Sequence, residues 1–221
     1  MGVRGVLFDS GGVLMGPRGG RWNPRYDFEE ILARHDSTVS VTAEALAAGR
    51  RVLDEATGTA DRADYHRAIL AELGVRPAPE LLAELEAPAA LPPVEFYPDV
   101  RPALELLRAR GIAMAVVSDA WPDLVDHYRA AGLAGFFTTF AISAVLGCTK
   151  PDPRMYAAGS DGLGLTPGEC LFIDDDPELV QAAVELGYQG VVLSRDGTAD
   201  QPSFLLTHLW SALPGDGRSV P

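Results

Sequence analysis

The stretch VRGVLFDSGG, residues 3–12, decides the fold of this chain. Residues 3–8 form a short apolar run, and Asp9 follows at once, at the start of a turn rich in glycine. Such a run is typical of a buried strand that leads into a loop, since glycine permits the tight turn. We therefore expect a central strand over 3–8 with the carboxylate of Asp9 at its carboxyl end.

The second half of the chain repeats this unit of strand, polar turn and helix. Apolar runs that predict strands cover residues 112–117, 136–143, 171–173 and 190–193. Helical patterns cover residues 99–110, 122–131 and 153–163, and a further one follows Asp176 and runs to Gly187. Strands that alternate with helices favour an α/β fold, with a parallel sheet covered on both faces.

Residues 17–95 break this rhythm, because their apolar positions follow the helical period in one segment after another. Asn23-Pro24 is typical of a helix start, and Thr42 and Asp61 are candidate caps of two further helices. We predict an α/β core of residues 1–16 and 96–213, a small all-helical domain of residues 17–95 inserted after the first strand, and a flexible tail over 214–221.

Composition and charge restrict the class of protein. The 221 residues are 47% hydrophobic, with 18 Lys and Arg against 31 Asp and Glu, a net charge of -13. So acidic a chain repels phosphate backbones and anionic lipids, and we expect neither nucleic acid nor a membrane as partner. No apolar stretch approaches the ~20 residues that span a bilayer, no leader opens the chain, and the two cysteines lack zinc-type spacing. We expect a cytoplasmic protein, and no pattern indicates an oligomeric state.

Polar residues at the ends of the predicted strands form a chemically coherent set. Ligands collect at the carboxyl ends of parallel strands, and these ends carry Asp9, Ser118 and Asp174-Asp175, with Lys150 on a nearby loop. Two carboxylates ~4 Å apart repel by about 4 kcal/mol, so either one is protonated or a cation lies among them. Oxygen ligands favour Mg2+, and a lysine beside it suits a phosphate that Asp9 could attack. All of this requires the groups to converge in one crevice.

Four short segments resemble, in the same order, the four motifs of the haloacid dehalogenase (HAD) superfamily. They are FDSGGVL at 8–14, VVSD at 116–119, KPDP at 150–153 and FIDD at 172–175. One such fragment alone is weak, but four in order across residues 3–195 are specific. The resemblance implies a Rossmann-like, three-layer core, a helical cap between the first and second motifs, and usually phosphoryl transfer from small metabolites.

The resemblance also implies roles for individual residues, with Asp9 as nucleophile and Lys150 as its catalytic partner. The expected phosphate contacts are Ser10, Ser118, Asp119 and Lys150. The expected ligands of Mg2+ are Asp9, the backbone carbonyl of Gly11, Asp174 and Asp175. We therefore predict a Mg2+-dependent phosphatase of a small phosphorylated metabolite that works through an aspartyl-phosphate.

Gly11 departs from this pattern, because phosphatases of the superfamily usually carry a second aspartate there as general acid and base. That group typically contributes ~10^2 to 10^4 in rate, so we expect aryl phosphates, which leave easily, to be better substrates than sugar phosphates. Leu179, near where many relatives carry asparagine, is a second departure. Two alternatives stay open: a dehalogenase, in which Asp9 attacks carbon without a metal, and a catalytically weakened phosphate-binding or regulatory protein.

Overall fold

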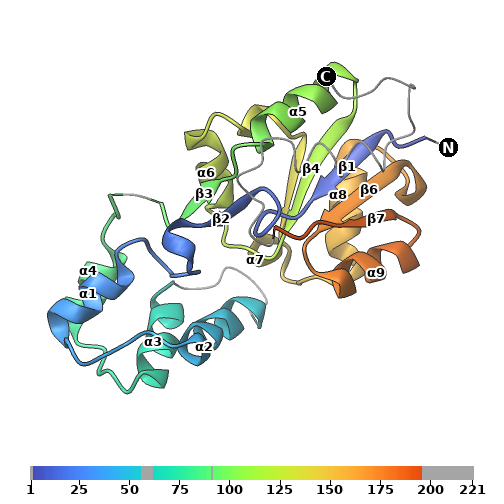
Figure 1. Ribbon diagram of the computed structural model, residues 1–221. Helices are drawn as coiled ribbons and strands as arrows, with labels where there is room; N and C mark the ends of the chain where they lie inside the picture. Colours follow the sequence, from blue (N-terminus) through green and yellow to red (C-terminus); the bar gives the residue numbers. More distant parts are fainter. Residues whose placement is uncertain (1, 56–61, 91, 196–221) are drawn as a thin grey trace.

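A five-stranded parallel sheet forms the centre of the computed structural model, which describes residues 2–55, 62–90 and 92–195 (Figure 1). Its order is β5-β4-β1-β6-β7. The strands are β1 (Gly5–Phe8), β4 (Ala113–Ser118), β5 (Thr139–Ile142), β6 (Cys170–Asp174) and β7 (Gln189–Val192). β1 pairs with both β4 and β6, so the first strand of the chain lies at the middle of the sheet. The predicted α/β fold with a parallel sheet is confirmed.

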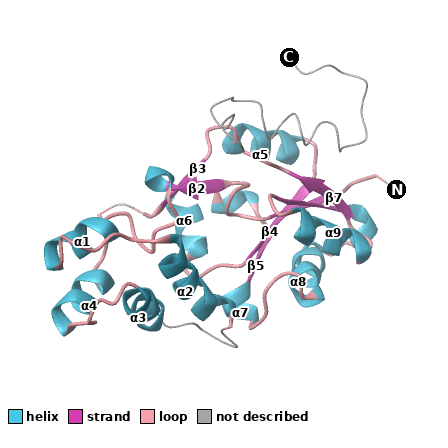
Figure 2. Cartoon of the chain, turned by 60° about the horizontal axis from the view of Figure 1, so that its bottom comes forward, coloured by secondary structure: helices cyan, strands magenta, loops and turns pink. Residues whose placement is uncertain are grey.

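Helices cover both faces of this sheet, which gives the predicted three layers (Figure 2). Side chains alternate along β1, so Val6 and Phe8 pack with α5 (Val100–Ala109) and α6 (Leu124–Ala130). Leu7 faces the opposite side, towards the cluster that α8 (Pro153–Leu163) and α9 (Pro177–Glu185) complete. The short helices are α7 (Ser143–Leu146), η2 (Ala134–Phe136) and η3 (Pro167–Glu169).

Four further helices form a module beside the sheet, with an apolar cluster of its own. We call them the helical module: α1 (Phe28–His35), α2 (Ala43–Asp54), α3 (Arg62–Glu72) and α4 (Pro79–Glu86). The chain enters it through β2 (Met15–Pro17) and the turn η1 (Arg18–Gly20), and leaves it through β3 (Val94–Phe96). β2 and β3 pair antiparallel, so the range 17–95 begins and ends in strand, which the helical pattern did not indicate.

The expected helix start at Asn23-Pro24 is wrong, because α1 begins at Phe28. Arg25, which is buried, explains the delay: its Nη1 donates to the carbonyls of Glu84, Leu85 and Ala87 at the end of α4, at 2.9, 2.9 and 2.8 Å. These contacts hold the residues before α1 in bends and a turn instead of a helix, which a local capping signal cannot foresee.

The predicted cap of the next helix is confirmed, since the Thr42 hydroxyl accepts from the backbone N–H of Ala45 at 3.2 Å. Asp61 and the predicted tail at 214–221 lie outside the described residues. Within the part of the chain that the structure describes, every helix is too short or too polar to cross a membrane.

His66 is a polar residue in the core of the helical module. It is 4% exposed, it stacks on Phe28, and within the described ranges its Nδ1 has no hydrogen-bond partner. Burial, with smaller contributions from the charges of Arg62 and Arg25, lowers the pKa of His66 from 6.5 to about 4. The folded state therefore keeps this imidazole neutral under conditions that protonate the unfolded chain.

Folding lowers the pKa of His66, so the unfolded chain binds a proton there more readily than the folded protein does. His66 therefore destabilises the folded protein increasingly as the pH falls from 6.5 towards about 4. Between about pH 7 and about pH 4.5, we expect the protein to lose on the order of 2 kcal/mol more unfolding free energy than the His66→Leu variant loses. Urea denaturation at both pH values measures this difference. Equal losses in the two proteins would show that His66 takes no part in acid sensitivity.

Candidate active site

The carboxyl ends of three adjacent strands bring the predicted catalytic groups to one edge of the sheet. Asp9 follows β1, and its backbone N–H donates to the carbonyl of Ile173 in β6 at 2.8 Å. Ser118 ends β4 and Asp174 ends β6. All three side chains are buried, with exposed fractions of 7, 4 and 1% for Asp9, Ser118 and Asp174. Convergence at this edge follows from the parallel order of the strands.

Lys150, the only lysine in the sequence, joins these strands from the loop after α7. Its Nζ donates to Oδ1 of Asp9 and to Oδ2 of Asp174, each at 2.6 Å. Its backbone N–H donates to Oδ1 of Asp119 at 3.0 Å, so the residue after Ser118 fixes the loop that carries the lysine. The required convergence of the acids and the ammonium is thus present in the structure.

Asp175 adds a third carboxylate. Asp9, Asp174 and Asp175 each offer one oxygen, and these oxygens lie within 4.8 Å of one another. Burial, reinforced by the charge of Asp9, raises the pKa of Asp174 to about 7 and also raises the pKa of Asp175. Burial alone would lower the pKa of Lys150, but the neighbouring carboxylates outweigh it and raise that pKa. One ammonium therefore faces more negative charge than it can neutralise.

Gly12 makes room for Asp175. A Cβ at this position would lie 2.2 Å from an oxygen of the Asp175 carboxylate, and the backbone φ of +74° also favours glycine. The glycine turn after Asp9 thus lets Asp175, which directly follows β6, approach the loop that carries Asp9. An oxygen-only cluster of this kind suits a hard cation such as Mg2+.

The other residues that were predicted to contact phosphate or Mg2+ lie at the same edge of the sheet. Ser10 is buried, and its hydroxyl forms a hydrogen bond of 2.8 Å with the hydroxyl of Tyr128 on α6. Gly11, Ser118 and Asp119 line the cavity in front of Asp9. Burial, opposed by Lys150, raises the pKa of Asp119.

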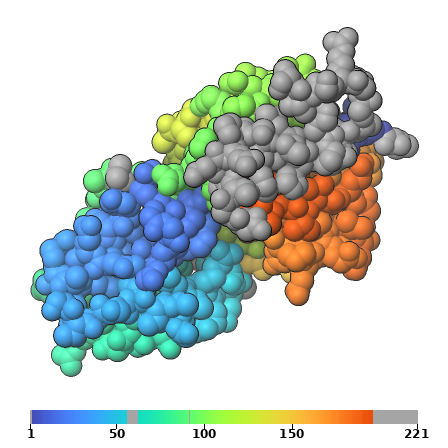
Figure 3. Space-filling view, in the orientation of Figure 1, coloured from blue at the N-terminus to red at the C-terminus, as the bar shows by residue number. Residues whose placement is uncertain are grey.

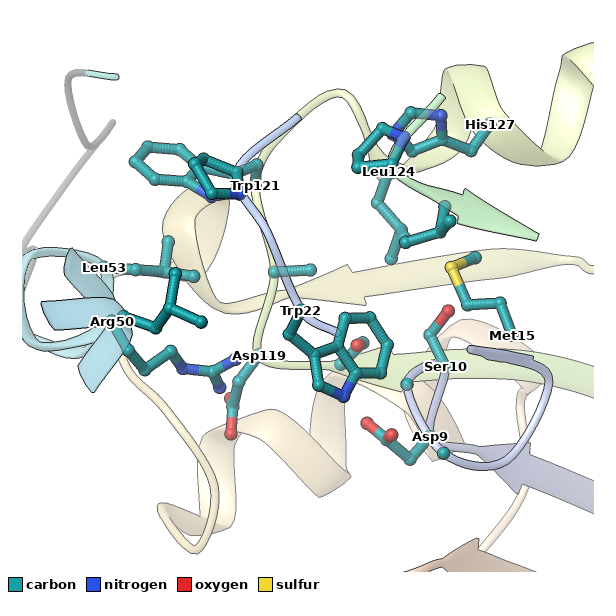
Figure 4. Close-up of a pocket in the computed structure, with 18 of the residues that line it drawn as sticks. Asp9, Ser10, Met15, Trp22, Arg50, Leu53, Asp119, Trp121, Leu124 and His127 are labelled. Atoms are coloured by element: carbon teal, nitrogen blue, oxygen red, sulfur yellow. The ribbon is translucent and has the colours of Figure 1, made fainter. Parts of the chain in front are cut away.

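This cavity, of about 590 Å³, lies between the sheet edge and the helical module. The space-filling view shows the module, in blue and cyan, against the α/β part of the chain (Figure 3). Figure 4 shows Asp9 and Ser10 on one side of the cavity and Arg50 and Leu53 of α2 on the other. A substrate at Asp9 would therefore touch residues of both parts.

Residues 3–187 match the family of haloacid dehalogenase-like hydrolases. The chain belongs to this family. It is therefore a hydrolase of the HAD type, and the resemblance in its four motifs is confirmed.

Relatives of this HAD-like hydrolase include both phosphatases and dehalogenases. It is 35% identical to Phosphatase MT3486 of Mycobacterium tuberculosis (strain CDC 1551 / Oshkosh) over 126 residues, which cover 55% of this chain and 57% of the relative. It is 31% identical to Haloacetate dehalogenase H-2 of Moraxella sp. (strain B) over 104 residues, 47% of this chain and 46% of the relative. The chain spans about half the length of the curated relatives it matches.

A solved dehalogenase structure is similar over 97% of this HAD-like hydrolase and 98% of its own chain, with a TM-score of 0.65. The sequence identity is 24%, so this likeness concerns the fold alone. The comparisons thus establish the hydrolase family and the fold, and both reactions occur among the relatives.

Several cavity residues of this HAD-like hydrolase were not predicted from the sequence. They are Trp22, Leu46, Arg50, Leu53, Arg62, Tyr65, Trp121 and His127. Arginines such as Arg50 carry no signal that separates them from surface residues, and Trp22 and Trp121 lie outside helices and strands, where no periodicity marks a buried or facing side.

Trp22 occupies the place opposite Gly11. A Cβ at Gly11 would lie 3.2 Å from Cη2 of the Trp22 indole and 4.0 Å from Oδ2 of Asp9. In Figure 4 the indole lies beside the Asp9 side chain. The Trp22 ring, which comes from the segment before α1, therefore crowds the space in which the family's usual second aspartate would extend.

An aspartate introduced at Gly11 alone is expected to leave the hydrolysis of alkyl phosphates no faster, because its carboxyl would have to displace the Trp22 indole. Combined with Trp22→Ala, the same Gly11→Asp change should accelerate alkyl phosphate hydrolysis by roughly tenfold or more over Trp22→Ala itself, as an added general acid does. Steady-state kinetics of the wild type, both single variants and the double variant measure this. A full gain in Gly11→Asp alone would contradict the steric argument.

Proposed function

We propose that this HAD-like hydrolase is a Mg2+-dependent phosphatase that acts on a small phosphorylated compound. The observation that carries the proposal is the cluster of Asp9, Asp174 and Asp175, whose oxygens lie within 4.8 Å of one another beside a single ammonium. Attack on carbon by one aspartate needs no such cluster. A divalent cation among the three carboxylates would balance their charge and attract a phosphate dianion.

Asp9, Asp174, Asp175 and the backbone carbonyl of Gly11 would hold the Mg2+. Bound there, the cation supplies positive charge that polarises a phosphoryl oxygen and weakens its repulsion of Asp9. A carboxylate oxygen of Asp9 attacks phosphorus, a bond to phosphorus forms, and the bond to the ester oxygen breaks. The leaving oxygen takes its proton from water, because Gly11 cannot supply one.

The other polar groups hold the transferred group during this step. Lys150 and the Ser118 hydroxyl bind the phosphoryl oxygens, while Asp119 acts through the Lys150 loop, to whose backbone it is bonded. Water then attacks phosphorus of the aspartyl-phosphate, which releases inorganic phosphate and restores the Asp9 carboxylate. All of these roles are part of the proposal. The Ser10 hydroxyl, which forms a hydrogen bond with the hydroxyl of Tyr128, helps to hold the loop that carries Asp9.

The helical module, within residues 17–95, is proposed as a cap over a core of residues 1–16 and 96–213. Arg62 of α3 pairs with Asp123 in the loop after β4, and Tyr65 packs edge-on against Trp121 with ring centroids 5.3 Å apart. These contacts join the module to the sheet edge across the cavity. Closure of such a cap would exclude bulk water from the phosphoryl transfer.

Parallel assays of phosphate release and halide release test the proposal. A panel of phosphomonoesters and 2-haloacids is offered to the protein with Mg2+ and after chelation. We expect phosphate release that needs Mg2+ and no halide release. Halide release without metal would establish the dehalogenase instead, and phosphate that raises Tm without any turnover would indicate a phosphate-binding protein.

Mg2+ affinity is expected to depend on pH, because the raised pKa of Asp174, about 7, makes protons compete for the site in the metal-free protein. Below about pH 7 the affinity should fall with falling pH, by up to roughly tenfold per pH unit for one competing proton. Above that pH it should level off. Calorimetric titration with Mg2+ across this range measures the effect, and an affinity independent of pH would contradict it.

A further inference from the structure

Three aromatic side chains form part of the wall of the cavity in front of Asp9, and we call this part the aromatic recess. Trp22, Tyr65 and Trp121 line it, and Leu46 and Leu53 of α2 add aliphatic surface. The rings of Tyr65 and Trp121 meet edge-on at an interplanar angle of 81°, so each fixes the orientation of the other. The recess is thus already formed in the absence of a ligand.

Trp22 leaves much of its indole uncovered in this recess. Trp22 is a large hydrophobic residue with 49% of its surface exposed, although its ring lies against Gly11 in the loop that carries Asp9. Exposed aromatic surface inside a cavity is unusual for structural residues and typical of a binding surface. The indole stands within reach of the position that a leaving group would take next to Asp9 (Figure 4).

The charged side chains that flank the rings are already engaged. Nε of Arg50 donates to Asp54 at 2.9 Å, and Arg62 pairs with Asp123 while its guanidinium lies 5.5 Å from the centre of the Trp121 ring. The hydroxyls of a sugar would have to compete with these pairs, whereas a flat apolar ring needs no polar partner there. The faces of the three rings therefore offer a surface that suits a flat aromatic group.

We propose that the recess binds the organic part of the substrate and that this part is an aromatic ring, so that the enzyme hydrolyses aryl phosphomonoesters. The inference rests on the proposed phosphatase function and names its substrate class. The aryl–oxygen–phosphorus link breaks at the phosphorus–oxygen bond, and the phenolate leaves with its electron pair. A phenolate departs without prior protonation, so a ring-binding indole can stand where other phosphatases of the family place an acid.

Two non-hydrolysable phosphonates measure how tightly the organic group binds, without any contribution from the ease with which a leaving group departs. Benzylphosphonate replaces the ester oxygen of phenyl phosphate by a methylene group, and ethylphosphonate lacks the ring. We expect benzylphosphonate to inhibit competitively with a Ki about tenfold lower than that of ethylphosphonate, the size of effect that aromatic stacking gives. Trp22→Ala should abolish most of this ratio, and Trp22→Phe should restore part of it.

Tyr26→Ala is the matched control, because Tyr26 is also exposed and belongs to the same segment but does not line the cavity. Phenyl phosphate and hexafluoroisopropyl phosphate, whose alcohol is about as acidic as phenol, form a second pair. We expect kcat/KM to favour the phenyl ester by about tenfold in the wild type and in Tyr26→Ala, and not in Trp22→Ala.

Equal Ki values for the two phosphonates in the wild type, together with hydrolysis of both esters at equal kcat/KM, would overturn the aromatic recess and leave the phosphatase function standing. A benzyl preference that survives Trp22→Ala unchanged would overturn the role of Trp22. Failure of every phosphonate to bind and of every ester to react would overturn the phosphatase function itself, and the inference with it.

Discussion

Asp9→Asn is expected to abolish turnover, with kcat lowered on the order of 10^4-fold or more, as removal of a nucleophile does in other hydrolases. The carboxamide is nearly the same size as the carboxylate but cannot attack phosphorus. The change also removes one negative charge from a buried cluster, and Lys150 keeps its second partner, Asp174. Thermal stability without Mg2+ should therefore be equal to that of the wild type or higher.

Stopped assays of phosphate release and thermal melts of the same preparations measure both effects. Asp126→Asn is the matched control, because Asp126 is an exposed aspartate on α6 that pairs only at the surface with Arg129. It should leave kcat unchanged. An Asp9→Asn protein that turns over at the wild-type rate would place the nucleophile elsewhere.

Lys150→Gln is expected to lower the free energy of unfolding more than any of the other proposed substitutions. The Nζ of Lys150 bridges two buried carboxylates at 2.6 Å, and its side chain is only 3% exposed. Removing one partner of a buried ion pair typically costs about 3–5 kcal/mol, because the remaining charge stays buried without compensation. Here two carboxylates, those of Asp9 and Asp174, would face each other. Phosphate binding should weaken as well, since the ammonium is lost.

The loss of stability in Lys150→Gln should be larger at high pH than at low pH. Without the ammonium, the pKa of Asp174, which burial already raises, rises further in the folded protein. The folded state then binds more protons than the unfolded chain, and its stability falls as the pH rises. Urea denaturation at about pH 5.5 and about pH 8 should show the smaller deficit at the lower pH, and Mg2+ should reduce the deficit at the higher one.

Arg154→Gln serves as the control for Lys150→Gln. Arg154 is a cation four residues further along, but its ion pair with Asp152 lies at the surface, where 66% of the Arg154 side chain is exposed. Water screens such a pair, so it contributes little to stability, and this variant should unfold close to the wild type. A similar loss of unfolding free energy in Lys150→Gln and Arg154→Gln would show that the buried ion pairs of Lys150 stabilise the protein no more than a surface pair does.

The sequence predicts well which polar residues meet at this edge of the sheet, and the reason is physical. Asp9, Ser118 and Asp174 each follow a short apolar run, and a run of that kind is a local signal of a buried strand. Once the strands are parallel, their carboxyl ends must meet, so residues more than 100 positions apart come together without any long-range information. The roles of these residues in catalysis stay predictions.

The pairing of β2 with β3 and the walls of the cavity could not be predicted in this way. β2 has three residues, one glycine and one proline among them, and its partner lies almost 80 positions later. Trp22 and Trp121 also meet the cavity from distant loops. Helix α1 starts late because Arg25 binds the end of α4. In each case a contact between remote segments overrides or replaces the local signal.

The presence of a single lysine in the sequence makes the protein its own spectroscopic probe. Protein grown on isotope-labelled lysine would carry one labelled side chain, at position 150, and its ammonium lies between two carboxylates of the cluster. Its NMR signal would report directly on ions and anions that enter the site. Binding of each candidate compound could thus be followed residue-specifically, without mutation, dye or assigned spectrum.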